Sequence, residues 1–231
     1  FYTGTDGDWT KARWFADLWE RFNYTTGVHI RRVHYRIISQ ETPVSMPDGM
    51  PYENTEKCWD FLNMAAKNAR YLGLVDASAF VDQRNPDARI FTPAPMDDPS
   101  TWINSNLWDG SLSLPGFPDL PDFSVENFAG MQRYHVEIWC EKSTMNDVLL
   151  PLCQRYGVNL QTGAGELSIT SCLELTHRAT TRPARILYVS DFDPAGQSMP
   201  LAVSRKVEFF QRTAGSAADI RLYPVVLLAD Q

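Results

Sequence analysis

Apolar side chains near the beginning of the chain recur at the three-to-four spacing of an amphipathic helix. Phe15, Leu18, Trp19 and Phe22 share one apolar stripe, which predicts a helix over residues 9–23. No run of about 18 consecutive apolar residues occurs in the sequence, so the pattern predicts no helix that crosses a membrane.

Two further helical patterns and a short apolar segment follow. Helices are predicted over residues 28–39 and 54–72, and Gly73 is a typical residue to end the second of them. The segment LVDASAFVD, residues 74–82, has the short, β-rich character of a wing. Three helices and a small β element predict a mostly α, winged helix-turn-helix domain over residues 1–90.

The pattern changes beyond residue 133, where short apolar strands alternate with helices. This alternation predicts an α/β domain over residues 133–231, with a parallel four-stranded sheet and helices on both of its faces. The predicted strands are residues 134–140, 157–163, 185–190 and 221–228, and the predicted helices are residues 144–156, 166–179 and 201–212.

An acidic, proline-rich segment, residues 91–132, separates these two patterns and is predicted to link two domains. Its aromatic content is too high for a solvated tether, so we expect much of it to pack against a neighbouring domain. The aromatic residues are Phe91, Trp102, Trp108, Phe117, Phe123 and Phe128.

The formal net charge of -7 is concentrated in this middle segment. Residues 91–130 carry six Asp and Glu and no Lys or Arg, whereas residues 1–90 carry 11 basic against 12 acidic side chains and residues 131–231 carry 10 against 10. The flanking domains are therefore free to present basic faces, and the acidic total does not exclude a nucleic-acid partner.

The remaining composition favours a reduced, cytoplasmic protein. The cysteines lie far apart without a CxxC pair, so we interpret them as packing residues rather than zinc ligands. The first residues lack the pattern of a signal peptide, and the last predicted strand ends close to the end of the sequence, so we expect the native chain to continue. The cysteines are Cys58, Cys140, Cys153 and Cys172.

Acidic side chains follow two predicted strands of the parallel sheet. Glu141 and Lys142 come after the first strand, and Asp191 and Asp193 come after the third, in a turn that Pro194 and its neighbours form. Because functional groups of parallel sheets gather beyond the carboxyl ends of strands, we expect the three carboxylates to converge. A hard divalent cation, Mg²⁺ or Mn²⁺, would compensate their repulsion, although each pattern alone is common on solvated loops.

The Glu-Lys pair after the first strand and the Asp-x-Asp-Pro-x-Gly turn after the third resemble the Toprim domain of topoisomerases, primases and related nucleases. Within that superfamily, residues 133–231 look most similar to the A subunit of topoisomerase VI and its meiotic double-strand-break relative. The resemblance implies that Glu141, Asp191 and Asp193 bind Mg²⁺ at a scissile phosphate, and that Lys142 contacts a phosphate nearby.

The same family places a winged helix before the Toprim domain, with a nucleophilic tyrosine in an Arg-x-x-Tyr-Tyr-like helix. Tyr35 aligns with the attacking residue, and His34 replaces the usual preceding tyrosine. A phenol is only about 0.1% ionised at neutral pH, so attack on phosphorus needs a positive environment, for which Arg31, Arg32, Arg36 and His34 are candidates. The competing interpretation is a helix tyrosine with a buried ring.

Further candidate contacts to double-stranded DNA are basic residues on the third predicted helix, Lys57, Lys67 and Arg70. A solvated helix face is an equally good explanation for them. The glycine-rich turn at residues 163–166 is a weaker candidate for holding a phosphate at a helix start. No GxxxxGK[ST] motif is present, so any ATP-driven step would need a separate ATPase subunit.

Three functions remain open. The leading hypothesis is Mg²⁺-dependent DNA cleavage by transesterification through Tyr35, in a homodimer where Tyr35 of one protomer meets the metal site of the other. The second is hydrolytic cleavage, as in the Toprim nucleases of SMC-like defence or chromosome-maintenance complexes. The third is a non-catalytic DNA-binding subunit. All three predict a cytoplasmic, nucleoid-associated protein.

Overall fold

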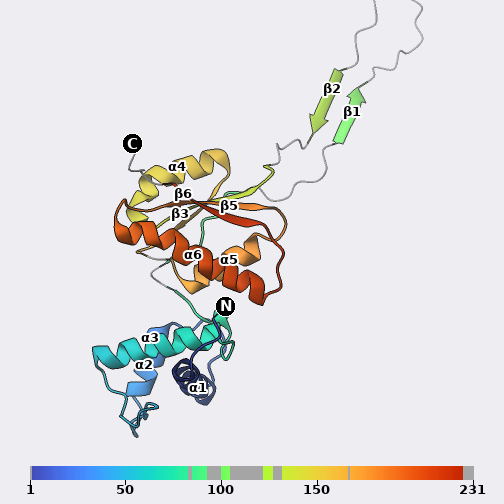
Figure 1. Ribbon diagram of the computed structural model, residues 1–231. Coiled ribbons are helices and arrows are strands. Elements are labelled where there is room, and N and C mark those ends of the chain that lie inside the picture. Colours follow the sequence, from blue (N-terminus) through green and yellow to red (C-terminus); the bar gives the residue numbers. More distant parts are fainter. Residues whose placement is uncertain are drawn as a thin grey trace, which may run out of the picture.

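The computed structural model describes residues 2–82, 85–92, 100–104, 122–126, 132–165 and 167–225. The helices near the N-terminus pack around one core and form a helical unit. The later part of the chain forms a sheet unit, in which helices pack against a sheet around two further cores (Figure 1). Within these described ranges, no helix is both long and apolar enough to span a membrane.

The N-terminal helices are α1 (Asp6–Arg21), α2 (Ile30–Ile38) and α3 (Glu56–Tyr71). They confirm the predicted helices, with ends that differ by one to three residues. Side-chain caps fix where two of them begin: Thr5 accepts a hydrogen bond from the Asp8 backbone N–H, and Thr55 accepts one from that of Cys58.

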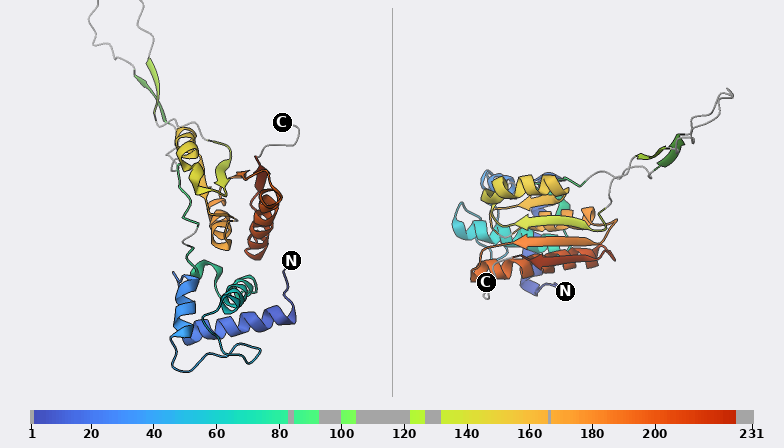
Figure 2. Two further views of the ribbon diagram at one scale, coloured as in Figure 1. Left: turned by 90° about the vertical axis from the view of Figure 1, so that its left-hand side faces the viewer. Right: turned by 90° about the horizontal axis from the view of Figure 1, so that it is seen from above.

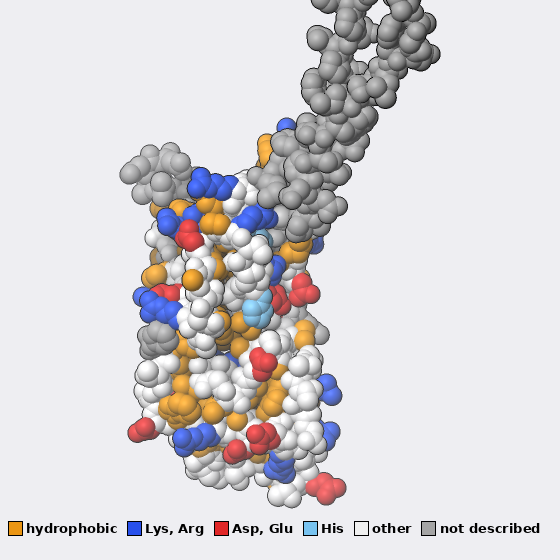
Figure 3. Space-filling model, turned by 90° about the vertical axis from the view of Figure 1, so that its right-hand side faces the viewer, with side chains coloured by type: hydrophobic (Ala, Val, Ile, Leu, Met, Phe, Trp, Pro, Cys, Tyr) orange, Lys and Arg blue, Asp and Glu red, His pale blue; other side chains and the backbone are white. Residues whose placement is uncertain are grey.

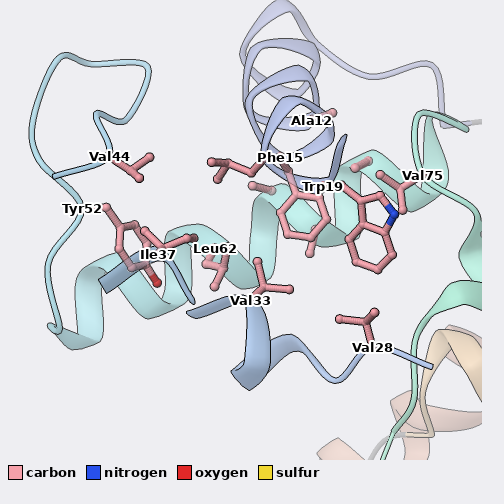
Figure 4. Packing of buried hydrophobic residues seen from close by; sticks show 14 of the residues in the cluster. Ala12, Phe15, Trp19, Val28, Val33, Ile37, Val44, Tyr52, Leu62 and Val75 are labelled. Carbon is pink, nitrogen blue, oxygen red and sulfur yellow. The ribbon is translucent and has the colours of Figure 1, made fainter. Parts of the chain in front are cut away.

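The apolar stripes of these helices meet in one core, whose packing is shown in Figure 4. Phe15 and Leu62 are fully buried between α1 and α3, and Val33 from α2 is buried with them. Burying each such side chain contributes about 1.5–3 kcal/mol to stability. The stripe predicted from the sequence is therefore what joins the three helices.

The predicted β wing at residues 74–82 is wrong. Residues 77–79 form a single 3-10 turn, η1 (Ala77–Ala79), and Phe80 makes one isolated parallel bridge with Val28. The Asp76 carboxylate accepts hydrogen bonds from the Ser78 backbone N–H and hydroxyl, both at 2.8 Å. This local turn replaces strand pairing, so the helical unit has no two-stranded wing in this stretch.

A four-stranded, all-parallel sheet follows, as predicted. Its strands are β3 (His135–Cys140), β4 (Asn159–Thr162), β5 (Ala184–Val189) and β6 (Ile220–Pro224), in the order β4-β3-β5-β6. The two central strands pair over their whole length, from His135 opposite Ala184 to Cys140 opposite Val189.

Helices cover both faces of this sheet, which confirms the predicted arrangement (Figures 1 and 2). On one face, Ile138 packs with Cys153 of α4 (Asn146–Tyr156), which follows the 3-10 turn η2 (Ser143–Met145). On the other, Trp139 packs with α5 (Ile169–Arg178) and α6 (Pro194–Thr213). Alternate residues of a strand point to opposite faces, so β3 supplies both cores.

The starts of α5 and α6 differ from the prediction for a local reason. The helix predicted from residue 166 begins at Ile169, where Ser168 is the N-cap. The helix predicted from residue 201 begins already at Pro194, because Asp193 caps it and proline is well suited to the first helical turn.

The segment between the two units contains an antiparallel pair of strands, β1 (Ser100–Asn104) and β2 (Asp122–Glu126). Figure 1 shows this pair standing apart from the sheet and helices. Phe91 is partly buried against the Ile138 cluster, as expected for a packed aromatic residue. The side chains of the other aromatic residues in the segment lie outside the described ones.

The helical unit meets the sheet unit at the end of α3. The Tyr71 ring lies against Phe209 and Phe210 of α6, with centroids 4.9 and 6.0 Å away. The Arg70 guanidinium donates to the Ala77 carbonyl at 2.8 Å and to the Thr170 hydroxyl of α5 at 2.9 Å. Both aromatic stacking and hydrogen bonds therefore hold the two units together.

A buried carboxylate ties β3 to α5. Glu137 is fully buried and accepts hydrogen bonds from Arg178 at 2.9 and 3.1 Å and from the Trp139 indole at 2.7 Å, and its Oε1 lies 2.7 Å from His135 Nε2. Burial alone would raise the pKa of Glu137, but the hydrogen bonds from His135 and Arg178 outweigh it and hold the pKa at about 2.

Removing the main partner of this carboxylate should strongly destabilise the fold. We expect Arg178→Ala to lower the free energy of unfolding by about 3–5 kcal/mol, because it removes the arginine that pairs with a buried carboxylate. Glu208→Gln, which breaks the exposed pair with Arg212, should cost less than about 1 kcal/mol. Urea unfolding measures both, and equal losses would contradict the role of Glu137.

Acid titration checks the same cluster. The pKa of Glu137 in the folded protein lies below the ordinary value of 4.5 for a glutamate. Its contribution to stability is therefore fully present above pH 4.5 and is lost as the pH falls toward 2. The wild-type stability should therefore decline over this range.

Candidate functional site

The pairing of β3 with β5 places the two acidic turns side by side. Cys140 and Val189 are opposite each other at the carboxyl ends of these strands, and the Glu141 backbone N–H donates to the Val189 carbonyl at 3.3 Å. Glu141–Lys142 and Ser190–Asp191 therefore leave neighbouring strands at one edge of the sheet, where parallel sheets bind their ligands.

An ion pair joins the two turns directly. Lys142 Nζ donates to Asp191 Oδ2, and about half of each side chain is exposed. The hydrogen bond to Asp191 raises the pKa of Lys142, with smaller contributions from the charges of Glu141 and Asp193. The ammonium group therefore stays charged and pairs with Asp191, one of the three predicted ligands.

Asp193 acts as the N-cap of α6. Its Oδ1 accepts a hydrogen bond from the Gly196 backbone N–H at 2.6 Å, and the Ser190 hydroxyl donates to the Gly196 carbonyl at 2.9 Å. A Cβ at position 196 would lie 2.2 Å from the Asp191 carbonyl oxygen, so the turn closes only with glycine there. The Asp-x-Asp-Pro-x-Gly pattern thus has a structural basis.

Glu141 is buried beside these turns, and one of its carboxylate oxygens lacks a hydrogen-bond partner among the described residues. The residue is 7% exposed, and Oε2 has no hydrogen-bond partner in the described part of the chain. Its backbone is held by the loop after β4, because the Gly165 N–H donates to the Glu141 carbonyl at 3.0 Å and Lys142 bridges with Ala164. An unpartnered buried carboxylate oxygen is costly unless a proton or cation satisfies it.

The donor set fits a hard cation chemically, because it consists of carboxylate oxygens with one of them unsatisfied. The three carboxylates do not yet form a closed ligand group: among the described residues, no set of three His, Cys, Asp or Glu side chains is arranged to hold a metal ion. Asp193 is engaged in its cap and Asp191 with Lys142, so metal binding would require these two side chains to turn.

Tyr35 lies on the surface of the helical unit, in a hollow that none of the three carboxylates lines. Its side chain is 60% exposed, which contradicts the interpretation of a buried helix tyrosine. It lines a hollow of about 400 Å³ together with Arg32 and Arg36, and the other lining residues are Phe22, Asn23, Tyr24 and Ser39. Two arginines and no carboxylate therefore line the same hollow as Tyr35.

Two predicted DNA contacts do not lie on an exposed basic helix face: His34 lies inside the helical unit, which corrects its assignment, and Arg70 lies where the two units meet. His34 is buried, with Nδ1 2.8 Å from the Tyr52 hydroxyl and Nε2 3.2 Å from Asn54 Oδ1. Arg70 joins the two units, and its burial lowers its pKa to about 10. Both side chains point from their helices toward the protein interior, and the sequence alone does not show this.

The other predicted DNA contacts are exposed, as a role in binding DNA requires. They are Arg31, Arg32, Arg36, Lys57, Lys67 and Lys142. Figure 3 shows that basic side chains on one face of the molecule stand at several separate places among acidic ones. A continuous basic stripe is not visible on that face.

The glycine-rich turn after β4 has a packing role that the sequence did not reveal. A Cβ on Gly163 would lie 2.2 Å from Asn85 Oδ1, so this glycine allows residue 85 to approach β4. The sequence analysis also did not predict the role of Ser190, whose hydroxyl donates to the Gly196 carbonyl in the Asp193 turn. A single serine after a strand is too common to indicate such a role. All four cysteines are free and buried, which confirms them as packing residues.

Comparison with known proteins gives no identification. No protein-family model matches this chain, and no curated protein is significantly similar to it. The function must therefore be argued from the residues and their arrangement.

Replacing Gly196 tests the geometry of the acidic turn. We expect Gly196→Ala to destabilise the fold by about 1–3 kcal/mol, because the added methyl group meets the Asp191 carbonyl. Gly7→Ala is the matched control: its nearest atom is 3.9 Å away in a helix, so alanine should be neutral or stabilise by up to about 1 kcal/mol. Thermal unfolding of both variants compares them, and a neutral Gly196→Ala would contradict the close turn.

Proposed function

We propose that this protein cleaves the phosphodiester backbone of double-stranded DNA with a divalent cation, Mg²⁺ or Mn²⁺, held by Glu141, Asp191 and Asp193. The observation that carries the proposal is the meeting of the two acidic turns at the carboxyl ends of adjacent parallel strands. The unpartnered buried oxygen of Glu141 supports it, because a cation would satisfy that oxygen.

Each residue has a distinct role in this proposal. When bound, the cation would supply positive charge at the scissile phosphate. Lys142 would leave Asp191 and contact a phosphate oxygen, and its raised pKa favours the charged form that this contact needs. The helical unit would grip the duplex through Arg31, Lys57 and Lys67, which are exposed.

The exposure of Tyr35 supports a transesterification route, as in the topoisomerase VI A subunits that the sequence resembles. The phenolic oxygen would form a bond to phosphorus while the bond from phosphorus to the leaving sugar oxygen breaks. The phenolic proton would pass to solvent, and the leaving oxygen would take up a proton. Arg32 and Arg36, which line the same hollow, would place positive charge beside the phosphate under attack.

This route needs a second protomer. The hollow around Tyr35 is lined by α2 and by residues 22–24 that follow α1, and none of the three carboxylates lines it. In the proposed homodimer, Tyr35 of one protomer would reach the carboxylates of its partner. A separate ATPase subunit would be required only if cleavage is coupled to strand passage.

Hydrolysis by a water molecule is the second candidate. The separation of Tyr35 from the carboxylates within one chain favours it, because a hydrolytic route requires only groups at the sheet edge. It would give free DNA ends, in contrast to the protein-linked ends of transesterification.

Removal of two carboxylates should abolish metal-dependent cleavage. We expect Asp191→Asn combined with Asp193→Asn to reduce cleavage of supercoiled plasmid by at least about a hundredfold with Mg²⁺ or Mn²⁺. Asp219→Asn, an exposed carboxylate that precedes β6, should leave cleavage unchanged. Full activity of the double variant would refute the assignment, and inactivity of the wild type with either metal would favour a non-catalytic DNA-binding subunit.

The role of Tyr35 is tested by whether the cleaved DNA ends are covalently linked to the protein. In the transesterification route, wild-type reactions stopped with detergent contain DNA that stays protein-linked until protease is added. Tyr35→Phe should remove the linkage and the cleavage together, whereas Tyr156→Phe, an equally exposed tyrosine on α4, should retain both. Undiminished cleavage with free ends in Tyr35→Phe would establish hydrolysis instead.

A further inference from the structure

A second hollow lies where the helical unit meets the sheet unit. Its volume is about 470 Å³, and its walls come from α2, α3, the segment after η1 and the first turn of α5. Neither Tyr35 nor any of the three carboxylates at the sheet edge lines it. This junction pocket is thus separate from both parts of the proposed cleavage site.

The junction pocket carries an excess of positive charge. Arg31, Lys67 and Arg70 line it, and Asp82 is the one carboxylate among its lining residues. Arg31 and Lys67 are exposed, so their charged groups can reach a ligand that enters from solvent. Formal charges of three against one favour an anion.

Arg70 adds an independent indication. Its side chain is largely removed from solvent, and its Nε is buried without a hydrogen-bond partner in the described part of the chain. Its other contacts there are to a carbonyl, a hydroxyl and the Phe80 ring, 4.7 Å from the guanidinium, and no carboxylate within 4.0 Å pairs with it. A buried cation without a paired anion is costly, and a bound anion would offset that cost.

Two further groups that line the pocket can donate hydrogen bonds or carry partial positive charge. His29 Nδ1 accepts a hydrogen bond from the Arg31 backbone N–H at 3.1 Å, so in the neutral ring the proton is on Nε2, which can donate. Ile169 and Thr170, in the first turn of α5, line the pocket, and that end of a helix carries partial positive charge.

We propose that the junction pocket binds a phosphate group through Arg31, Lys67 and Arg70, and that the bound group bridges the two units. The phosphate has two chemical sources, the backbone of a nucleic acid or a free phosphate monoester. The first source rests on the proposed function, whereas binding of phosphate itself does not.

The test compares two variants that each lose two positive charges. Arg31→Ala/Lys67→Ala removes the exposed cations of the pocket, and Arg155→Ala/Arg205→Ala removes two exposed cations outside it. Wild type and both variants are titrated calorimetrically with inorganic phosphate and with a short DNA duplex, in EDTA and at two salt concentrations. Unfolding midpoints verify that all three proteins are folded.

We expect the pocket variant to bind at least one probe about tenfold more weakly than the control variant. If the duplex is the affected probe and phosphate competes with it, the source is a nucleic-acid backbone, and the salt slope should fall by about two in the pocket variant. If only phosphate is affected, the source is a phosphate monoester. Equal affinities of the two variants for both probes overturn the proposal.

This experiment stands apart from the cleavage assays. EDTA removes the divalent cation, so a failure of the carboxylate site does not alter the result. Conversely, metal-dependent cleavage that persists when the junction pocket fails to bind phosphate would leave the proposed function intact.

Discussion

The parallel pairing of β3 with β5 is the constraint on which the candidate site depends. Because Cys140 and Val189 end in register, the chain delivers Glu141 and Lys142 beside Asp191 without any long-range loop. The cores on both faces of the sheet hold this register, through Ile138 toward α4 and Trp139 toward α5 and α6. A slip of one residue would exchange the two faces, so the hydrophobic pattern also fixes where the acidic turns meet.

Much of the fold was predictable because its signals are local or periodic. The three N-terminal helices, the four strands and their parallel arrangement follow from apolar spacing at periods of 3.6 and 2. The sequence wrongly predicted a β wing at residues 74–82. There Asp76 and Ser78 form a turn through a side-chain hydrogen bond, which competes with strand pairing in a stretch of β-rich composition. The winged-helix interpretation of the helical unit is therefore not confirmed, although its three helices are.

The candidate site was predictable in its composition but not in its contacts. The sequence places Glu141, Asp191 and Asp193 at strand ends, yet it does not reveal that Asp193 caps α6 or that Lys142 holds Asp191. Arg70 shows the same limit, since only its hydrogen bond to Thr170 of α5 reveals that it faces the other unit. Such roles depend on tertiary neighbours, which a helical or strand period does not specify.

The cation site is the central claim, and direct binding of Mn²⁺ tests it most simply. Electron paramagnetic resonance titration should show one site per chain in the wild-type protein that is lost in the variant Glu141→Gln/Asp191→Asn, where two oxygen ligands become amides. Weak binding to the acidic segment of residues 91–130 should be equal in both proteins. The account predicts a difference of one bound Mn²⁺, and identical titrations of the two proteins would contradict it.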